Sequence, residues 1–394
     1  MKAIIHNSIA NGTYKAIPSK SLLHRYIILA SLAKGVSIIK NFYDCDDVSS
    51  TINAFKLFGV KFSVEGDNLV VSSNGLKHLD KVIVDANESA TTLRLLIPVL
   101  INYANEVRFI GKNSLFSRPN DEYKKLFGED IDISDKDIIV KAKLKGDTLY
   151  LEANVSSQFV SGVVLASILK DVPTTIIIQG KVTSASYIDL TIEACKSFGA
   201  NIKVDENVIY VLSSKLEARC VSVEGDYSQA ANFIVLSKIN NHIDIVGLNE
   251  KSSQADKTIY DLLESDEINL ENNIDLGPIL FSYAASLCKQ TKFIGTNRLM
   301  IKESNRLYAM KEELAKFGVV LTIYDDVCFI NGANELRASS ELSSHSDHRI
   351  CMALAILASI AKNSVVIDGI ECVNKSYPSF FDDLGSLGIK IIIK

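Results

Sequence analysis

The sequence Ala54-Phe-Lys-Leu-Phe-Gly59, followed by the alternating run Val60-Lys-Phe-Ser-Val64, carries the pattern that decides the fold. Apolar residues at helical spacing end at a glycine, which can adopt the positive φ angle that often terminates a helix. Apolar and polar residues then alternate as in a half-buried strand, and Leu69-Val-Val71 follows after a turn. The stretch therefore predicts an amphipathic helix followed by a β-hairpin.

The same plan recurs along the chain. Its helix-ending glycines stand in Lys124-Lys-Leu-Phe-Gly128, Ala194-Cys-Lys-Ser-Phe-Gly199, Glu313-Leu-Ala-Lys-Phe-Gly318 and Leu384-Gly-Ser-Leu-Gly388. Copies are spaced by about 70 residues, with one gap nearly twice as long. In that gap we interpret Ile259-Tyr-Asp-Leu-Leu-Glu264 with Ile268-Asn-Leu270 as a degenerate copy. We therefore predict six α/β units, none of which buries its apolar face alone.

Six such units fit the 394 residues as two domains of three units each. Hinges are expected near Ile17-Pro18 and near Val223-Glu-Gly-Asp226. The predicted domains are a discontinuous one of residues 1–18 and 225–394, and a second of residues 19–224. The predicted fold class is α/β.

Composition limits the function classes. The 42 Lys and Arg against 47 Asp and Glu give a net charge of −5, which argues against nucleic acid held by bulk positive charge. No stretch reaches the roughly 18 uninterrupted apolar residues of a membrane span, and the first residues lack the apolar core of a signal peptide. The seven cysteines form no CxxC pair, and His and Cys show no metal-ligand spacing. We therefore expect a cytoplasmic protein that holds no metal. It should bind neither nucleic acid nor membrane.

Cations stand at the predicted helix starts. A helix amino terminus carries about half a positive charge, so a cation there is unfavourable unless an anion binds. One such cation is unremarkable, but a series on equivalent elements of a repeated fold predicts highly anionic ligands. The series comprises Lys20, Arg25, Arg94, Lys302, Arg306, Arg349 and Lys375. Ser19 and Ser304 are the predicted amino-terminal caps beside two of these groups.

Neutral donors stand at two further helix starts. Ser156-Ser-Gln158 and Ser184-Ala-Ser-Tyr187 each precede an apolar run. Their hydroxyls either cap the helices or form a cradle for a phosphate. Asp275, in Asn273-Ile-Asp-Leu-Gly-Pro278, is open to the same two interpretations, a simple cap or a functional carboxylate.

In this order, the motifs resemble those of the 5-enolpyruvylshikimate-3-phosphate synthases over essentially the whole chain. The resemblance rests on Pro18-Ser-Lys-Ser-Leu-Leu-His-Arg25, Ser89-Ala-Thr-Thr-Leu-Arg94, Arg118-Pro119, Ser156-Ser-Gln158, Ser184-x-x-Tyr187, Glu224-Gly-Asp226, Asp275-Leu-x-Pro278, Lys302-Glu-Ser-Asn-Arg306, Asp347-His-Arg349 and Lys375. It implies a two-domain inside-out α/β barrel of six βαβαββ-type units, with the site in the cleft between the domains. It also implies a transferase that moves the enolpyruvyl group of phosphoenolpyruvate to the 5-hydroxyl of shikimate 3-phosphate and releases phosphate. The reaction belongs to the shikimate pathway of chorismate and aromatic amino acid biosynthesis and uses no cofactor.

The resemblance assigns roles to individual residues. The shikimate 3-phosphate site would comprise Lys20, Ser21, Arg25, Ser156, Ser157, Gln158, Ser184, Asp275 and Lys302. Within it, Arg25 would bind the carboxylate and the serines at 156, 157 and 184 would hold the 3-phosphate. The phosphoenolpyruvate site would comprise Lys20, Ala90, Gln158, Arg306, Arg349 and Lys375, with the two arginines on the carboxylate.

The implied chemistry moves two protons: the 5-hydroxyl loses one and the enol carbon gains one. Asp275 as base and Glu303 as acid fit this demand, and Lys20 is a third predicted catalytic residue. The cations beside Glu303 oppose its neutral form, unless the anionic substrates are bound. Lys20 and Lys302 are alternative proton carriers, and the sequence does not rank them.

Three positions depart from the family pattern. Ala90 stands where a glycine is usual, which narrows the phosphoenolpyruvate pocket and predicts reduced sensitivity to the inhibitor glyphosate. Ser114 replaces a frequent arginine, so that one phosphate contact is either missing or supplied by Lys112. Met300 replaces a commonly basic residue.

The motifs leave two alternative functions. The first is a UDP-N-acetylglucosamine enolpyruvyl transferase, which typically uses a loop cysteine. This chain has no cysteine between Cys45 and Cys195, and Ser21 rather than asparagine follows Lys20. The second, a non-catalytic anion-binding protein of the same fold, is disfavoured because the candidate catalytic residues are all present. A monomer is expected.

Overall fold

The computed structural model describes all 394 residues, which divide into two compact units. Unit 1 comprises Met1–Ile17 and Gly225–Lys394, and unit 2 comprises Pro18–Glu224. The first boundary between the units falls after Ile17, one residue before the predicted boundary after residue 18. A backbone hydrogen bond stabilises each unit beside the two points where the chain passes from one unit to the other. In unit 2, Ser19 N–H donates to the Glu224 carbonyl, and in unit 1, Asp226 N–H donates to the Ile17 carbonyl, both at 2.8 Å.

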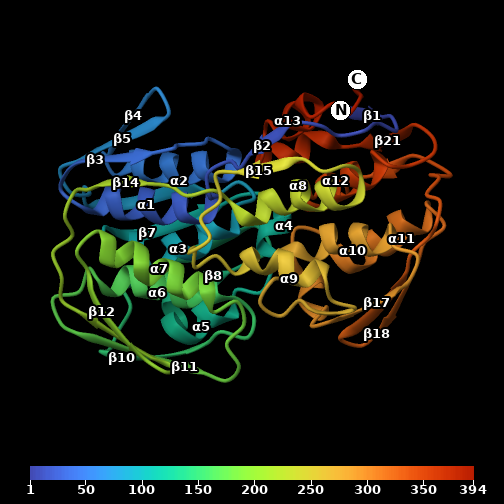
Figure 1. Cartoon of the computed structure of the whole chain (residues 1–394). Helices are drawn as coiled ribbons and strands as arrows, with labels where there is room; N and C mark the ends of the chain where they lie inside the picture. The colour runs from blue at the N-terminus through green and yellow to red at the C-terminus, as the bar shows by residue number, and fades with distance from the viewer. The chain divides into compact units, whose positions relative to one another are not determined.

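Unit 2 contains three four-stranded sheets with the same plan (Figure 1). In each sheet two parallel strands are joined to an antiparallel hairpin, as the repeated sequence pattern predicts. One sheet has the order β6-β7-β9-β8. Its elements are β6 (Leu79–Asp85), α3 (Ala90–Leu100), β7 (Ala104–Ile110), α4 (Asn113–Phe116), α5 (Asp121–Phe127), η1 (Gly128–Asp130), β8 (Ile131–Ile133) and β9 (Asp137–Val140).

The other two sheets of unit 2 have the same plan. The order β10-β11-β13-β12 uses β10 (Thr148–Glu152), α6 (Ser157–Ser167), β11 (Thr174–Gln179), α7 (Ser186–Ser197), β12 (Asn201–Asp205) and β13 (Val208–Leu212). The order β14-β3-β5-β4 uses α1 (Lys20–Leu32), β3 (Gly35–Lys40), α2 (Asp46–Leu57), β4 (Lys61–Glu65), β5 (Asn68–Ser73) and β14 (Cys220–Ser222). The last strand of unit 2 thus completes its first sheet.

Unit 1 has two four-stranded sheets of the same plan. The order β16-β17-β19-β18 uses β16 (Glu267–Asn269), η3 (Ile274–Leu276), α10 (Gly277–Ala285), β17 (Gln290–Ile294), η4 (Asn297–Ile301), α11 (Arg306–Ala315), β18 (Val320–Tyr324) and β19 (Val327–Asn331). The order β20-β21-β1-β22 uses β1 (Lys2–Ile5), β20 (Leu342–Ser343), α12 (His348–Ala358), β21 (Val365–Asp368), η5 (Ile370–Lys375), α13 (Phe380–Ser386) and β22 (Ile391–Ile393). Here the first strand of the chain replaces one hairpin strand, so the two termini meet at this sheet (Figure 1).

The sixth unit is degenerate, but not as predicted. It consists of β2 (Thr13–Lys15), α8 (Tyr227–Ile239), β15 (Asp244–Val246), η2 (Ala255–Thr258) and α9 (Ile259–Leu263). The predicted helix is α9, whereas Ile268 lies in β16, the first strand of the next sheet, instead of in a hairpin strand. Only residues 264–266 separate α9 from β16, so the unit has no hairpin and its sheet has two strands.

Helices form the interior of each unit. The first helix of each repeat is apolar on nearly all faces and buried, as expected of a core helix. In unit 1, α8, α10 and α12 contact one another, and in unit 2, α3 packs on α6. Strands such as β5 alternate between buried and more exposed residues. Helices inside and sheets outside give the predicted inside-out α/β architecture.

Candidate functional site

In unit 1 the predicted base and three predicted cations meet. Asp275 lies in η3, and its Oδ1 is 3.2 Å from Lys302 Nζ and 2.9 Å from Arg306 NH1. Its Oδ2 is 3.5 Å from Arg349 NH2. Lys302 follows η4, Arg306 opens α11 and Arg349 is the second residue of α12. Residues far apart in sequence therefore surround one carboxylate.

Arg306 is the centre of this cluster. Its side chain is 1% exposed, and its guanidinium also binds Glu303 Oε2 at 2.6 Å and Asp347 Oδ2 at 2.8 Å. Asp347 caps α12 by accepting the Arg349 N–H at 2.9 Å. The role of Asp347 as partner of Arg306 was not predicted, because the two residues are 41 positions apart.

The cluster shifts the pKa values of its members. Burial opposes the charged form of Asp275, but Lys302, Arg349 and Arg306 outweigh it and hold the pKa of Asp275 well below 3.8. Burial, together with the nearby Arg298 and Arg306, lowers the pKa of Lys302 to about 8, although Asp275 opposes that shift. A lysine of this pKa gains and loses its proton near neutral pH.

Two local predictions in unit 1 were wrong, and one of the two interpretations of Asp275 is excluded. Ser304 does not cap α11: Asn305 does, through a 3.3 Å bond from Tyr308 N–H, while the Ser304 hydroxyl donates to Asp347 at 3.1 Å. Asp275 is no helix cap, because it lies inside η3 and Leu276 precedes α10. The last helix, α13, begins at Phe380 rather than directly after Lys375.

In unit 2, two predicted cations lie on α1, where Lys20 is partly exposed and Arg25 is buried. Lys20 is its first residue, and Lys20 Nζ lies 2.6 Å from Oδ2 of Asp47, a partner that was not predicted. Ser19 occupies the predicted cap position, but its hydroxyl makes no capping bond. Ser21 follows Lys20, and its carbonyl accepts a bond from Arg25 NH1 at 2.7 Å.

Arg25 is 2% exposed and is bound by neutral oxygens. Arg25 Nε donates to Thr191 Oγ1 at 2.7 Å, and NH2 donates to the Tyr187 carbonyl at 2.9 Å. Burial lowers the pKa of Arg25 to about 10. A buried guanidinium held this way is prepared for an anionic ligand.

The neutral donors of unit 2 also lie at helix starts. The Ser156 hydroxyl caps α6 by accepting the Gln158 N–H at 3.3 Å, and Ser157 is the first residue of that helix. Gln158 bridges to α3, because its Nε2 donates to Thr91 Oγ1 at 2.9 Å and its Oε1 accepts from Arg94 NH1 at 3.2 Å. Ser184 is 3% exposed and has a left-handed φ of 56°.

The structure locates the departures from the family pattern. Ala90 is the first residue of α3, directly after the cap Ser89. Ser114 lies in the short helix α4. Lys112, its predicted substitute, pairs with Glu88 at 2.9 Å. Met300 is 37% exposed on η4.

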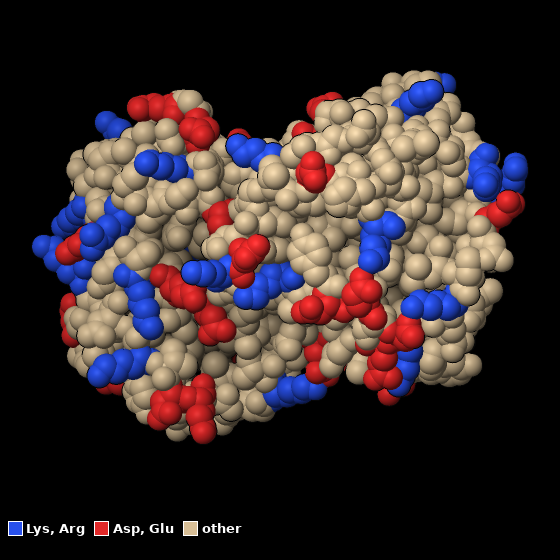
Figure 2. Space-filling view, in the orientation of Figure 1, with Lys and Arg blue, Asp and Glu red and all other residues tan.

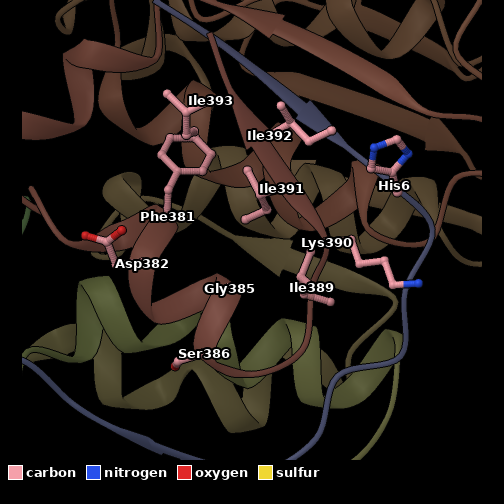
Figure 3. A pocket seen from close by; sticks show the side chains of 10 residues that line it. All are labelled: His6, Phe381, Asp382, Gly385, Ser386, Ile389, Lys390, Ile391, Ile392 and Ile393. Carbon is pink, nitrogen blue, oxygen red and sulfur yellow. The ribbon is translucent and has the colours of Figure 1, made fainter.

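A hollow of about 750 Å³ lies elsewhere in unit 1 (Figure 3). It is lined by β22, by α13 and by His6. None of the predicted site residues belongs to it, and its lining is mainly apolar. Figure 2 shows small groups of both charges on one face of the molecule, without a continuous basic surface.

Comparison with solved structures assigns the class of fold. The chain is similar to an EPSP synthase from Acinetobacter baumannii, with a TM-score of 0.80, 22% identity, and 100% and 99% of the two chains covered. It is also similar to the enolpyruvyl transferase NikO from Streptomyces tendae, with the same TM-score of 0.80, 15% identity, and coverage of 99% and 98%. The fold is that of enolpyruvyl transferases.

Sequence comparison assigns the family within this class. The model of EPSP synthase (3-phosphoshikimate 1-carboxyvinyltransferase) matches residues 6–266 and 261–384. A 3-phosphoshikimate 1-carboxyvinyltransferase of Clostridium perfringens (strain ATCC 13124) is 35% identical over 417 aligned residues, with 98% of both chains covered. One from Clostridioides difficile (strain 630) is 33% identical, with 98% and 97% covered. The chain belongs to the EPSP synthase family, which confirms the predicted family and fold class.

Proposed function

We propose that the side-chain clusters described above serve the family's reaction. The enolpyruvyl group of phosphoenolpyruvate passes to the 5-hydroxyl of shikimate 3-phosphate, and phosphate is released, in the shikimate pathway of aromatic amino acid biosynthesis. The observation that carries the proposal is the convergence of Lys302, Arg306 and Arg349 on the carboxylate of Asp275. Such a cluster combines a carboxylate for hydroxyl chemistry with cations for anionic substrates.

Shikimate 3-phosphate would bind through unit 2. The carboxylate would pair with Arg25, whose buried guanidinium is otherwise held by neutral oxygens. The 3-phosphate would accept bonds from Ser156, Ser157 and Ser184, of which the first two stand at the amino terminus of an 11-residue helix. Lys20 and Gln158 would contact both substrates.

Phosphoenolpyruvate would bind through Arg306, Arg349 and Lys375. Arg306 already gives four bonds to three carboxylates, so most of its charge is balanced within the protein. Arg349 and Lys375 would add further positive charge at the phosphoenolpyruvate site. Arg306 would mainly hold the acidic residues in place.

The proton transfers would use Asp275, Lys302 and Glu303. In the addition step the 5-hydroxyl loses its proton and the enol carbon gains one; the enol carbon then gives up a proton as the bond to phosphate breaks and phosphate leaves. A carboxylate as acidic as Asp275 is a weak base, so it would orient the 5-hydroxyl and accept its proton as the new C–O bond forms and the hydroxyl becomes acidic. Lys302 is an acid suited to neutral pH, since its pKa is about 8. Glu303 would donate a proton only after separating from Arg306.

The test is phosphate release from phosphoenolpyruvate in the presence of shikimate 3-phosphate, with UDP-N-acetylglucosamine as the competing acceptor. We expect turnover with shikimate 3-phosphate alone. Turnover with the sugar nucleotide instead, or with neither acceptor, would contradict the proposal.

We also propose a monomer that acts in the cytoplasm and binds neither nucleic acid nor membrane. In the structure, no helix combines the length and the apolarity that a transmembrane segment needs. Light scattering coupled to size-exclusion chromatography should give the mass of one chain, 43.2 kDa.

A further inference from the structure

Two consecutive residues directly before α12 have left-handed backbone angles. The φ angle is 52° at His345 and 54° at Ser346, in a region that residues with a Cβ seldom occupy. Such strain persists only where surrounding contacts fix it. The next residue is Asp347, which binds Arg306 and caps α12. The strained turn therefore sets the position of a central residue of the unit 1 cluster.

The contacts that fix this turn come from Glu313, a fully buried residue of α11. Glu313 Oε1 lies 2.8 Å from His345 Nε2, and Oε2 accepts the Ser343 N–H at 3.0 Å. Lys316 donates to both oxygens, at 2.8 and 2.9 Å. With Lys316 on both oxygens, Glu313, Glu312 and His345 are arranged as an ion-paired group rather than as a metal site.

A second set of contacts joins the turn to η5. The Ser344 hydroxyl donates to the Gly369 carbonyl at 2.9 Å and accepts the Ser346 N–H at 3.2 Å. Gly369 has a φ of 77°, and a Cβ there would lie 2.5 Å from Ser344 Oγ, so this close approach requires glycine. Gly369 directly precedes η5, which ends at Lys375.

We propose that His345 and Glu313 form a latch that positions the phosphoenolpyruvate-binding cations Arg306, Arg349 and Lys375. The latch joins α11, which begins with Arg306, to the turn that leads into α12 and Arg349 and that touches the start of η5. His345 and Glu313 are thus positioning residues, and the inference rests on the proposed function of the three cations.

The latch depends on pH. The charged groups that act on His345 are Glu313 and Glu312 of α11 and Lys316, which directly follows this helix. The hydrogen bond to Glu313 raises the pKa of His345, and burial and Lys316 only partly offset it. Protonated His345 makes a charge-assisted bond, which weakens as the pH rises through this pKa. Phosphoenolpyruvate affinity should fall over the same range.

The experiment measures KM for each substrate from about pH 6 to about pH 9 in wild type, His345→Leu and His345→Gln. His345 is chosen because it is partly exposed, whereas a Glu313 variant risks misfolding. Leucine removes the donor, so KM for phosphoenolpyruvate should rise about tenfold at neutral pH, while KM for shikimate 3-phosphate and kcat change less than about twofold. Glutamine keeps a donor without titrating, so it should restore KM but abolish the contribution of His345 to the pH dependence.

Two controls separate the latch from the proposed function. His242→Leu removes an exposed histidine 3.7 Å from Asp244 and should leave both KM values unchanged. Arg349→Ala tests the substrate site itself, and an unchanged KM for phosphoenolpyruvate there would refute the proposed function. If Arg349→Ala raises KM but His345→Leu matches wild type at every pH, or if the leucine and glutamine variants are equally impaired, the latch is overturned.

Discussion

Lys302 Nζ lies 3.2 Å from Asp275 Oδ1, which pairs a lysine of lowered pKa with a carboxylate that stays charged. The pKa of Lys302 is about 8, so its proton is present at neutral pH and lost as the pH rises through that value. The pair can therefore pass a proton to substrate without a large energetic penalty.

We predict that kcat/KM falls above about pH 8 because neutral Lys302 no longer donates a proton. Lys302→Arg keeps the positive charge but holds its proton too tightly, so kcat should fall by about 10²- to 10⁴-fold while KM for shikimate 3-phosphate stays within about threefold. Assays of phosphate release at a series of pH values measure both the pH dependence of kcat/KM and the effect of the substitution. Full turnover in Lys302→Arg would exclude the proton transfer, and Lys292→Arg, in an exposed pair with Glu267, should behave as wild type.

Asp275→Asn should lower kcat by about 10²- to 10⁴-fold, since the amide orients the 5-hydroxyl but accepts no proton. It also leaves three cations with one carboxylate fewer, so phosphoenolpyruvate should bind at least as tightly as in wild type. Titration calorimetry and single-turnover assays separate these effects. Asp266→Asn, which removes an exposed pair with Lys289, is the matched control. An Asp275→Asn enzyme that turns over normally contradicts the assignment of the base.

Asp256 gives a pH prediction for stability. This carboxyl is 2% exposed, accepts bonds from Ser228 and Asn273, and has its pKa raised from 3.8 to about 6, mainly by burial. The folded state thus binds its proton more tightly than the unfolded state does. Its stabilising contribution is complete below about pH 4 and is lost as the pH rises through about 6, up to about 3 kcal/mol in total.

Asp256→Asn removes this loss because the amide is neutral and can still bond to both partners. Relative to wild type, the variant should therefore gain free energy of unfolding as the pH rises from about 4 to about 7. Denaturant unfolding at each pH measures the difference. A constant difference across that range would mean that Asp256 is ionised in the native protein throughout it. Asp261→Asn, on α9, is the control.

The repeat and the helix starts could be predicted because they are local. The glycine-ended helices indicated five of the six units. The cations at predicted helix starts identified Lys302, Arg306 and Arg349 of the unit 1 cluster and Lys20 and Arg25 of α1. The assignment of Ile268-Asn-Leu270 to a hairpin after α9 was wrong. These residues have the same strand pattern whether they belong to that unit or to the next sheet, which is where they lie.

Partners distant in sequence could not be predicted. Arg25 meets Thr191 across 166 positions, and nothing near either residue encodes that contact. The cap of α11 shows the same limit. Ser304 and Asn305 are both good capping residues, and the choice depends on Asp347, which takes the Ser304 hydroxyl. Local chemistry thus predicts candidate residues, and tertiary packing assigns their bonds.

Ala90 leads to the prediction on inhibition. It is the first residue of α3 and has a helical backbone that accommodates a methyl group. The resemblance to the family assigns this residue to the proposed phosphoenolpyruvate site. Ala90→Gly should increase glyphosate sensitivity by about 10- to 100-fold, the usual effect of one methyl group in a pocket. Loss of the methyl should also lower the free energy of unfolding by up to about 1 kcal/mol.

Inhibition curves at fixed phosphoenolpyruvate, together with thermal melting, distinguish the two effects. Ala315→Gly, at the exposed last residue of α11, should lower stability without changing inhibition. Strong inhibition of the wild-type enzyme by low glyphosate that Ala90→Gly leaves unchanged would show that the methyl group lies outside the pocket. A shift confined to Ala90→Gly would place this methyl group against phosphoenolpyruvate, because stability loss alone affects both variants.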